Sequence, residues 1–314
     1  MKHLYCYCSE SLNPWKNLAL EEYLLDHVPA DTLILYLWQN QNTVVIGRNQ
    51  NVWSECDVNW LRAEGGFIAR RLSGGGAVYH DVQNLNFSFV ADQDTYDLSR
   101  QMNIILQTVS SFGLPAQCSG RNDMVIEGRK FSGNAFFQRN NKHLHHGTLL
   151  INTDTEAMNR YLRVSEEKLK SKGVSSVKSR IVNLQELNPE ITVDTAKARI
   201  LDITAQICCM EPEEWTLSDS DQSDINALER KFSSWEWIFG RRIPFTWSKE
   251  GYFSWGGADI RLSVNRGIVE QAVIYSDAMD AKFIEFLQSR ITGNRFGDIQ
   301  TADVIDLSDI QIDH

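Results

Sequence analysis

Ala69-Arg-Arg-Leu-Ser-Gly-Gly-Gly-Ala-Val-Tyr-His80 sets two arginines beside three consecutive glycines, between two strand-like segments. Three glycines remove every Cβ from a short arc of chain, so main-chain N–H groups can approach an anion closely. Arg70 or Arg71 can add a charge-assisted hydrogen-bond fork. Taken alone, a glycine triplet is also typical of a flexible turn, and the stretch matches neither a Walker loop nor the dinucleotide fingerprint. It therefore indicates either an anion cradle of another kind or a simple turn.

The segments around the glycines predict an α+β protein. Residues 67–72 enter the loop and residues 77–80 leave it, both with strand patterns, so the glycines connect two strands. Residues 116–151 are typical of an antiparallel meander, and helical spacing predicts helices over 17–25, 97–112, 192–209 and 224–237. The acidic run 211–224 is expected to be an exposed connection, and the lysine-rich residues 165–180 a basic loop suited to an anionic ligand.

The pattern changes after Pro244. Short strands at 253–255, 258–264 and 268–276 precede a helix from about Met279 to Ile291. Gly240 and Pro244 bracket a charged segment that continues neither pattern. The sequence therefore predicts a large catalytic domain over 1–242 and a small α+β C-terminal domain over 243–314.

Composition limits the classes of protein to which this chain can belong. The formal charge is −10 and the length is 314 residues, which suits two domains and disfavours a general nucleic-acid binder. No apolar run reaches the ~18 residues that would span a bilayer. The six cysteines form no C-x-x-C pair and suggest reduced thiols. We expect a cytoplasmic monomer that binds neither nucleic acid nor membrane.

A second candidate site is Ser119-Gly-Arg-Asn-Asp123, followed by Glu127-Gly-Arg-Lys-Phe-Ser-Gly133. Lys130 at a hairpin end is commonly a solvated residue, but here it can hold a phosphate or carboxylate as a point charge. Asn122 and Asp123 are ordinary turn residues by propensity. Alternatively, Asp123 binds Mg²⁺, which prefers one or two carboxylates together with substrate phosphates.

Three histidines and one cysteine invite other chemistry. His143, His145 and His146 lie in one strand, and no other cluster in the sequence supplies the further ligands that a metal site would need. We therefore expect His146 to donate or accept a hydrogen bond near the site and the other two histidines to lie on the surface. Cys118 is expected to be a small buried thiol, because no neighbour activates it. No Gly-x-Ser-x-Gly elbow supports a serine hydrolase.

Five ordered motifs together resemble the bacterial lipoate–protein ligase A family. They are Arg70-Arg-Leu-Ser-Gly-Gly-Gly-Ala-Val-Tyr-His-Asp81, Gly120-Arg-Asn-Asp123, Gly128-Arg-Lys-Phe-Ser-Gly133, His145-His-Gly-Thr148 and Ser176-Val-Lys-Ser-Arg180. The resemblance extends from Pro14-Trp-Lys-Asn-Leu-Ala19 to Trp255-Gly-Gly257, which is nearly the whole chain. It implies a catalytic domain of the biotin ligase type, related to class II aminoacyl-tRNA synthetases, with a mixed sheet and flanking helices, plus a small accessory C-terminal domain.

The resemblance also implies a two-step reaction. Lipoate and MgATP give lipoyl-AMP and pyrophosphate, and the lipoyl group then moves to a lysine of apo lipoyl domains in 2-oxoacid dehydrogenase complexes and in the glycine cleavage H protein. Lys130 would bridge the lipoyl carbonyl and the α-phosphate, and residues 172–183 would close on the adenylate. The expected adenylate site comprises Arg71, Ser73, Gly75, Gly76, Ala77, Val78, Tyr79, Asn122, Asp123, Lys130 and His146, with Asp123 as the magnesium ligand. Trp38, Val45 and Phe136 are expected to line an apolar pocket for the dithiolane and its alkyl tail.

Two departures and three alternatives stand beside this interpretation. Gln83 replaces a glycine that many relatives carry, and the chain ends sooner than relatives whose accessory domain has more helix. One alternative is an ATP-independent octanoyl or lipoyl transferase of the same superfamily, which would need a cysteine nucleophile. The others are a non-catalytic module that binds lipoyl-AMP or a lipoyl domain, and an enzyme that uses biotin in place of lipoate.

Overall fold

The computed structural model describes residues 1–120, 122–163, 181–253 and 255–296, and its larger part is built on one eight-stranded sheet. The strand order is β11-β1-β2-β6-β10-β9-β8-β7. Neighbours β1 and β2 run parallel, as do β1 and β11, and the others are antiparallel, so the sheet is mixed as predicted. The strands are β1 His3–Cys8, β2 Thr32–Trp38, β6 Asn84–Asp92, β7 Ala116–Ser119, β8 Asp123–Ile126, β9 Arg129–Arg139, β10 Lys142–Leu150 and β11 Glu213–Glu214.

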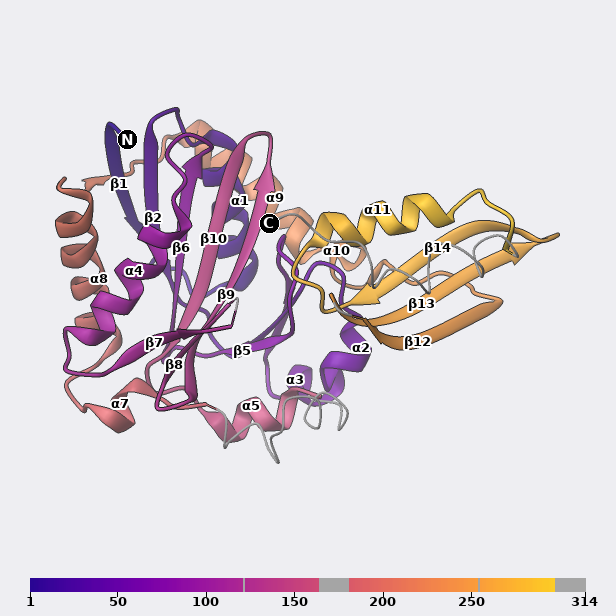
Figure 1. Ribbon diagram of the computed structural model, residues 1–314, viewed down its shortest axis with the longest axis horizontal. Helices are drawn as coiled ribbons and strands as arrows, with labels where there is room; N and C mark the ends of the chain where they lie inside the picture. The colour runs from indigo at the N-terminus through magenta and orange to yellow at the C-terminus, as the bar shows by residue number, and fades with distance from the viewer. Residues whose placement is uncertain (121, 164–180, 254, 297–314) are drawn as a thin grey trace.

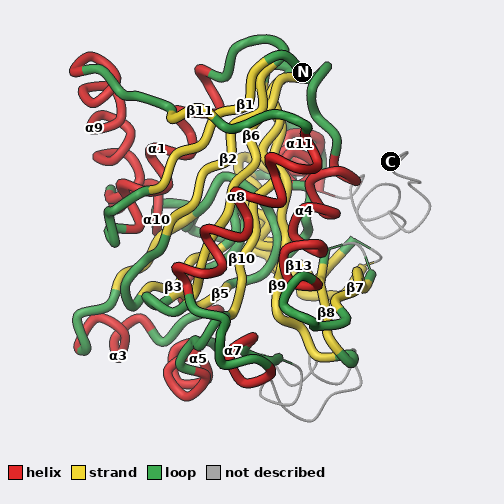
Figure 2. The backbone as a smooth tube through the Cα atoms, turned by 90° about the vertical axis from the view of Figure 1, so that its left-hand side faces the viewer, coloured by secondary structure: helices red, strands yellow, loops and turns green. Residues whose placement is uncertain are grey.

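Helices cover both faces of this sheet (Figures 1 and 2). On one face, α4 and α8 pack against the side chains that include Leu33, Leu35 and Leu37 of β2. On the other face, α1 and α9 pack against the alternate side chains of the same strand. Every position of β2 is therefore buried, which explains its continuous apolar sequence. The helices are α1 Pro14–His27, α4 Leu98–Ser110, α8 Val193–Cys208 and α9 Asp219–Ser233, with the four-residue α7 Leu184–Leu187 beyond β10.

A second, three-stranded sheet carries the glycine loop. Its order is β4-β3-β5, with β3 Thr43–Ile46, β4 Phe67–Arg70 and β5 Val78–His80. The glycines leave β4 and enter β5 on the other side of β3, so the predicted strand-to-strand connection is confirmed. Short helices pack around this sheet: α2 Val52–Glu55, α3 Val58–Ala63, α5 Thr155–Tyr161 and α10 Trp235–Phe239.

The C-terminal part forms a separate small α+β unit, drawn on the right of Figure 1. Three antiparallel strands, β12 Trp247–Phe253, β13 Gly256–Asn265 and β14 Ile268–Ser276, carry the helix α11 Ala281–Ile291 on one face. The core of this unit is its own and includes Ile260, Val269 and Ile284. The boundary after residue 242 stays a prediction.

Two predictions for the polar segments had different outcomes. The acidic run 211–224 is not a connection throughout, because α9 begins at Asp219 and the N-cap Ser218 forms a capping box with Asp221. Acidic side chains at a helix N-terminus are favoured by the helix dipole, so the same charges that suggested an exposed loop stabilise a helix start. The expected basic loop 165–180 lies outside the described residues. Within the described part of the chain, no helix is long and apolar enough to cross a membrane.

Candidate functional site

A cavity of about 250 Å³ opens where the two sheets of the larger part meet the start of α11. Its lining contains every residue of the expected adenylate site except Ser73 and Tyr79. Tyr79 points to the opposite side of β5, where its ring packs 5.6 Å from that of Tyr161. Ser73 is fully buried behind the lining. The lining comprises Leu18, Trp38, Val45, Arg71, Gly75, Gly76, Ala77, Val78, His80, Asn86, Asn122, Asp123, Lys130, Gly133, Asn134, Ala135, His146, Gly147, Thr148 and Met279.

The two adjacent arginines separate at the end of β4. The Arg71 guanidinium faces the cavity and donates to Gly74 O at 2.6 Å and Gly76 O at 2.8 Å, so it holds the glycine loop by its carbonyls. Arg70 points to the other side, where all of its acceptors among the described residues are main-chain carbonyl oxygens. Burial lowers the pKa of Arg71 to about 10, which leaves the guanidinium charged at neutral pH. Arg71 and not Arg70 lines this cavity, and the role of Arg71 as a site residue stays a prediction.

The three glycines differ in what they contact. Gly74 lies against the C-terminal unit, and a Cβ built there would stand 2.2 Å from Ala278 O. Gly75 has φ +87°, and its N–H donates to the same carbonyl at 3.0 Å. A Cβ on Gly76 would meet nothing within 4 Å among the described atoms. Gly74 and Gly75 therefore pack against the backbone of the C-terminal unit, and in the described part of the chain only Gly76 of the three leaves its backbone open to an anion.

A hydrogen-bonded chain supports Arg71 from behind. Arg71 Nε donates to Ser73 Oγ at 3.0 Å, and Ser73 Oγ lies 2.7 Å from His146 Nε2. His146 Nδ1 lies 2.8 Å from Glu21 Oε1, which also accepts from Ser88 Oγ at 2.6 Å. A His146 tautomer with its proton on Nδ1 donates to Glu21 and accepts the Ser73 hydroxyl proton at Nε2, so every bond in this chain has a donor. His146 thus forms the hydrogen bonds predicted for it.

Lys130 and Asp123 form an ion pair at the mouth of the cavity. Their Nζ and Oδ1 atoms are 2.7 Å apart, and both side chains are partly exposed. A Cβ on Gly133 would stand 2.6 Å from Lys130 Nζ, so this glycine leaves room for the lysine. Asp123 is the single carboxylate of the described lining. One carboxylate fits an ion that takes its other ligands from substrate phosphates and water, as Mg²⁺ does, although the described residues offer no cluster of three metal-ligating side chains.

Apolar side chains line another part of the cavity. Trp38 and Val45 are among them, as expected, and Leu18 and Ala135 join them. Phe136 was wrongly expected there: it points to the opposite face of β9, where its ring lies 5.1 Å from that of His145. The cavity therefore combines cationic and apolar walls.

Two other expectations for single residues were wrong. His145 is not on the surface but completely buried among aromatic rings, and burial lowers its pKa to about 3. Cys118 is exposed on β7 and not buried, because β7 lies at the sheet edge.

Among the site residues that sequence reasoning missed, two come from elements that are far from their partners in the chain. Glu21 lies on α1 at a position that its neighbours make apolar, and its partner His146 is 125 residues away. Met279 reaches the cavity from the C-terminal unit, with its Sδ 3.7 Å from Asn122 Nδ2. Both contacts join elements that are distant in the chain, so no local pattern carries them.

Comparisons with known proteins show which family this chain resembles. Residues 13–205 match the family model "Lipoyl protein ligase A/B catalytic domain", and residues 242–312 match "Bacterial lipoate protein ligase C-terminus". Lipoate-protein ligase A of Blochmanniella pennsylvanica is 39% identical over 91% of this chain and 86% of its own length. The corresponding protein of Psychrobacter cryohalolentis is 37% identical over 90% and 86%.

Two solved structures share the fold. P. falciparum LipL1 in complex with lipoate is similar with a TM-score of 0.81 and 29% identity, covering 93% of this chain and 90% of that one. A bi-partite lipoate protein ligase from Thermoplasma acidophilum, studied with its E2 lipoyl domain, has a TM-score of 0.68 and 25% identity over 79% of this chain and 100% of its own. With both of its parts matched and curated relatives aligned over most of their length, this chain belongs to the lipoate–protein ligase A family.

Proposed function

We propose that this chain is an ATP-dependent lipoate–protein ligase that forms lipoyl-AMP and transfers the lipoyl group to a lysine of a lipoyl domain. The observation that carries the proposal is the two-sided cavity. Arg71 and Lys130 supply positive charge beside a wall formed by side chains such as Trp38 and Val45. This pairing suits an acid with an apolar tail, whose carboxyl group must meet a phosphate.

The first step brings a carboxylate and a triphosphate together, so the site must stabilise the negative charge that builds at phosphorus. Lys130 lies at the mouth of the cavity, where its ammonium can contact both the carboxyl and the α-phosphate. Arg71 fixes the glycine loop, and Gly76 leaves its backbone open toward the nucleotide. Asp123 would hold Mg²⁺, which neutralises phosphate charge when it is bound.

In the second step the acceptor lysine attacks the acyl carbon and AMP leaves. Lys130 can then stabilise the oxyanion at the carbonyl. The acceptor amine must first lose a proton, since a free lysine has a pKa of about 10.4. We propose apo lipoyl domains of 2-oxoacid dehydrogenase complexes and the glycine cleavage H protein as acceptors. The archaeal relative, which was studied with its E2 lipoyl domain, supports the class of acceptor.

A mass measurement on an apo lipoyl domain tests the proposal. With lipoate, the acceptor should gain one lipoyl group only when MgATP is present, and pyrophosphate release should depend on lipoate. Gain of an acyl group from a thioester donor without ATP would instead indicate the transferase. No cysteine is among the cavity-lining residues that the structure describes, which disfavours that alternative. An assay in which lipoate and biotin compete for the enzyme would show which of the two acids is the substrate.

A further inference from the structure

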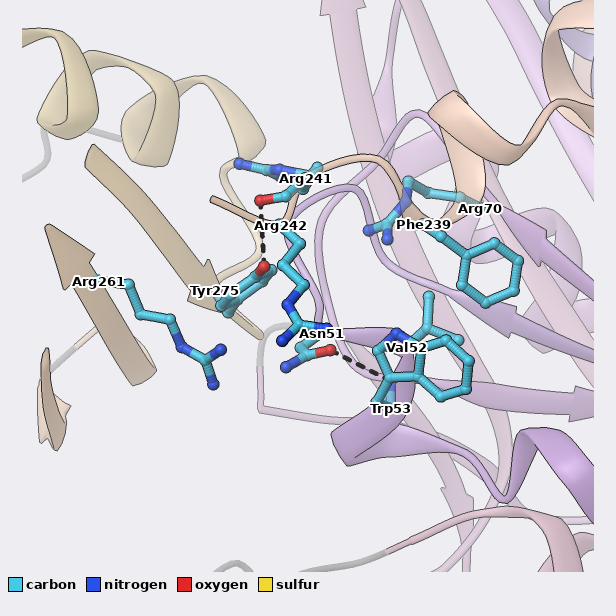
Figure 3. Close-up of a pocket in the computed structure, with 9 residues that line it drawn as sticks. All are labelled: Asn51, Val52, Trp53, Arg70, Phe239, Arg241, Arg242, Arg261 and Tyr275. Atoms are coloured by element: carbon cyan, nitrogen blue, oxygen red, sulfur yellow. Dashed lines mark hydrogen bonds between the residues drawn. The ribbon is translucent and has the colours of Figure 1, made fainter. Parts of the chain in front are cut away.

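A second cavity lies on the far side of Arg70, between the larger part and the C-terminal unit (Figure 3). It has a volume of about 270 Å³. Figure 3 shows Arg242 extending from the connecting segment toward Asn51, and Arg261 pointing from β13 into the same space. The lining comprises Asn51, Val52, Trp53, Arg70, Phe239, Arg241, Arg242, Arg261 and Tyr275.

The lining of this arginine cavity is strongly cationic. Among the residues that the structure describes, it contains four arginines and no aspartate or glutamate. Asp259 pairs with Arg261 at 2.7 Å from outside the lining. Arg70, Arg241 and Arg242 have no carboxylate within ion-pair distance among the described residues, in a chain whose total charge is −10. The cavity is therefore locally positive, although the chain as a whole is negative.

Burial makes this charge costly. The Arg70 side chain is almost fully buried, and burial, together with the Arg241 and Arg48 charges, lowers its pKa to about 9. Burial and the Arg48 charge lower the pKa of Arg241 to about 10, against the opposing effect of the Glu285 carboxylate, which pairs with Arg48. Both groups stay protonated at neutral pH, so like charges face one another in a partly dry space. An anion that enters the cavity would relieve this repulsion.

The arginines differ in the hydrogen bonds that they have left to offer. Arg70 donates to the carbonyl oxygens of five residues, Gly47, Arg48, Gln50, Trp237 and Ile238, so it holds the backbone together and contributes mainly its charge. Arg241 is similarly engaged with Arg48 O and Gln288 Oε1. Arg242 makes no hydrogen bond to any described residue, and Arg261 donates to Asp259 from Nε and Nη2 only. The Arg242 guanidinium and Arg261 Nη1 are therefore the available donors.

We propose that the arginine cavity binds a polyvalent phosphate-class oxyanion that contacts both parts of the chain. The planar fork of Arg242 can hold two phosphate oxygens, and Arg261 Nη1 and the Asn51 amide can bind the others. Such an anion would join β13 to the segment before α2 and so stabilise the present arrangement of the two parts. The site is separate from the lipoate cavity, because Arg70 and Arg71 point to opposite sides of β4.

Thermal unfolding of the full chain tests this inference. Sodium phosphate or pyrophosphate at millimolar concentration should raise the Tm by at least about 2 °C over sodium chloride of equal ionic strength. Arg242→Gln should abolish the rise, and Arg242→Lys, which keeps the charge without the fork, should retain part of it. Arg290→Gln removes an exposed arginine from α11 and should keep the full effect.

Lys130→Ala separates the two cavities. If the anions act at the arginine cavity, this variant should still show a rise in Tm, and adding Arg242→Gln should abolish it. A rise that Lys130→Ala loses and Arg242→Gln keeps would place the anion at the lipoate cavity and overturn the inference. So would an effect of phosphate no larger than that of chloride. Isothermal titration with pyrophosphate gives the second readout, with one site expected in Lys130→Ala and its loss expected on adding Arg242→Gln.

Discussion

Replacing Lys130 by alanine should stop adenylate formation and leave the fold intact. The lysine side chain is 27% exposed, and its ion pair with Asp123 at 2.7 Å lies at a cavity mouth. Such partly exposed pairs stabilise by ~0–1 kcal/mol. For a chain of this size, a loss of that order corresponds to at most about 2–4 °C in Tm.

The expected catalytic loss is much larger. Removing one donor from a site where negative charge develops costs ~10²–10³ in kcat, or about 3–4 kcal/mol. Lipoate-dependent pyrophosphate release measured beside the Tm therefore separates a catalytic effect from a structural one. Lys142→Ala is the matched control, because that lysine lies on the neighbouring strand, is partly exposed and donates to the backbone of Asp26. It should change neither quantity appreciably.

Three outcomes would refute this reasoning about Lys130. Near-normal pyrophosphate release in Lys130→Ala would remove the lysine from the chemistry. A loss of activity that Lys142→Ala shares would point to a general effect of charge. A fall in Tm far beyond a few degrees would mean that the lysine supports the fold.

Three further perturbations test the surroundings of the site. Gly74→Ala should destabilise the chain by ~1–3 kcal/mol, because its Cβ would stand 2.2 Å from Ala278 O, whereas Gly76→Ala should keep the Tm. Burial lowers the pKa of His145 to about 3, so the unfolded state takes up the proton first as the pH falls. The contribution of His145 to the free energy of unfolding should be full above pH 6.5 and decline by up to ~1.4 kcal/mol per pH unit below it. Urea unfolding of His145→Gln at several pH values should show a shallower decline. Ser73→Ala removes the hydroxyl that joins a guanidinium to an imidazole and should lower kcat/KM about tenfold, the equivalent of one net hydrogen bond, as steady-state kinetics would show.

Strands and helices with strong patterns were predictable from the sequence. The continuous apolar run of β2 requires cover on both faces of the sheet, and α4 and α8 on one face and α1 and α9 on the other supply it. The acidic start of α9 is typical of an exposed loop by its charge, but Ser218 and Asp221 carry the capping pattern of a helix start, and that local signal decides the structure. Element type was therefore recoverable wherever the local signal was complete.

The candidate site was predictable as a set of segments but not as a set of side-chain directions. Tyr79 belongs to the right strand and points out of the cavity, since adjacent residues of a strand alternate in direction. Phe136 fails for the same reason. A shift of one residue in an assumed strand phase exchanges the two faces, and no motif records that phase. Glu21 and Met279 needed the tertiary fold, because each meets its partner across more than 100 residues.

Arg70 and Arg71 show what alternation does at a functional edge. The two residues are adjacent in the chain, but their guanidinium groups hold different segments. Arg70 binds the segment that leads to the C-terminal unit, and Arg71 binds the glycine loop. Arg70 ends β4 and Arg71 follows it directly, so a displacement of the connecting segment that moves Arg70 would also shift Arg71. The two cations therefore cannot substitute for each other, although either could have served an anion when only the sequence was considered. An Arg70→Lys exchange would keep the charge and lose the planar donors that reach five carbonyl groups, so its effect should appear first in stability and only through Arg71 in adenylate formation.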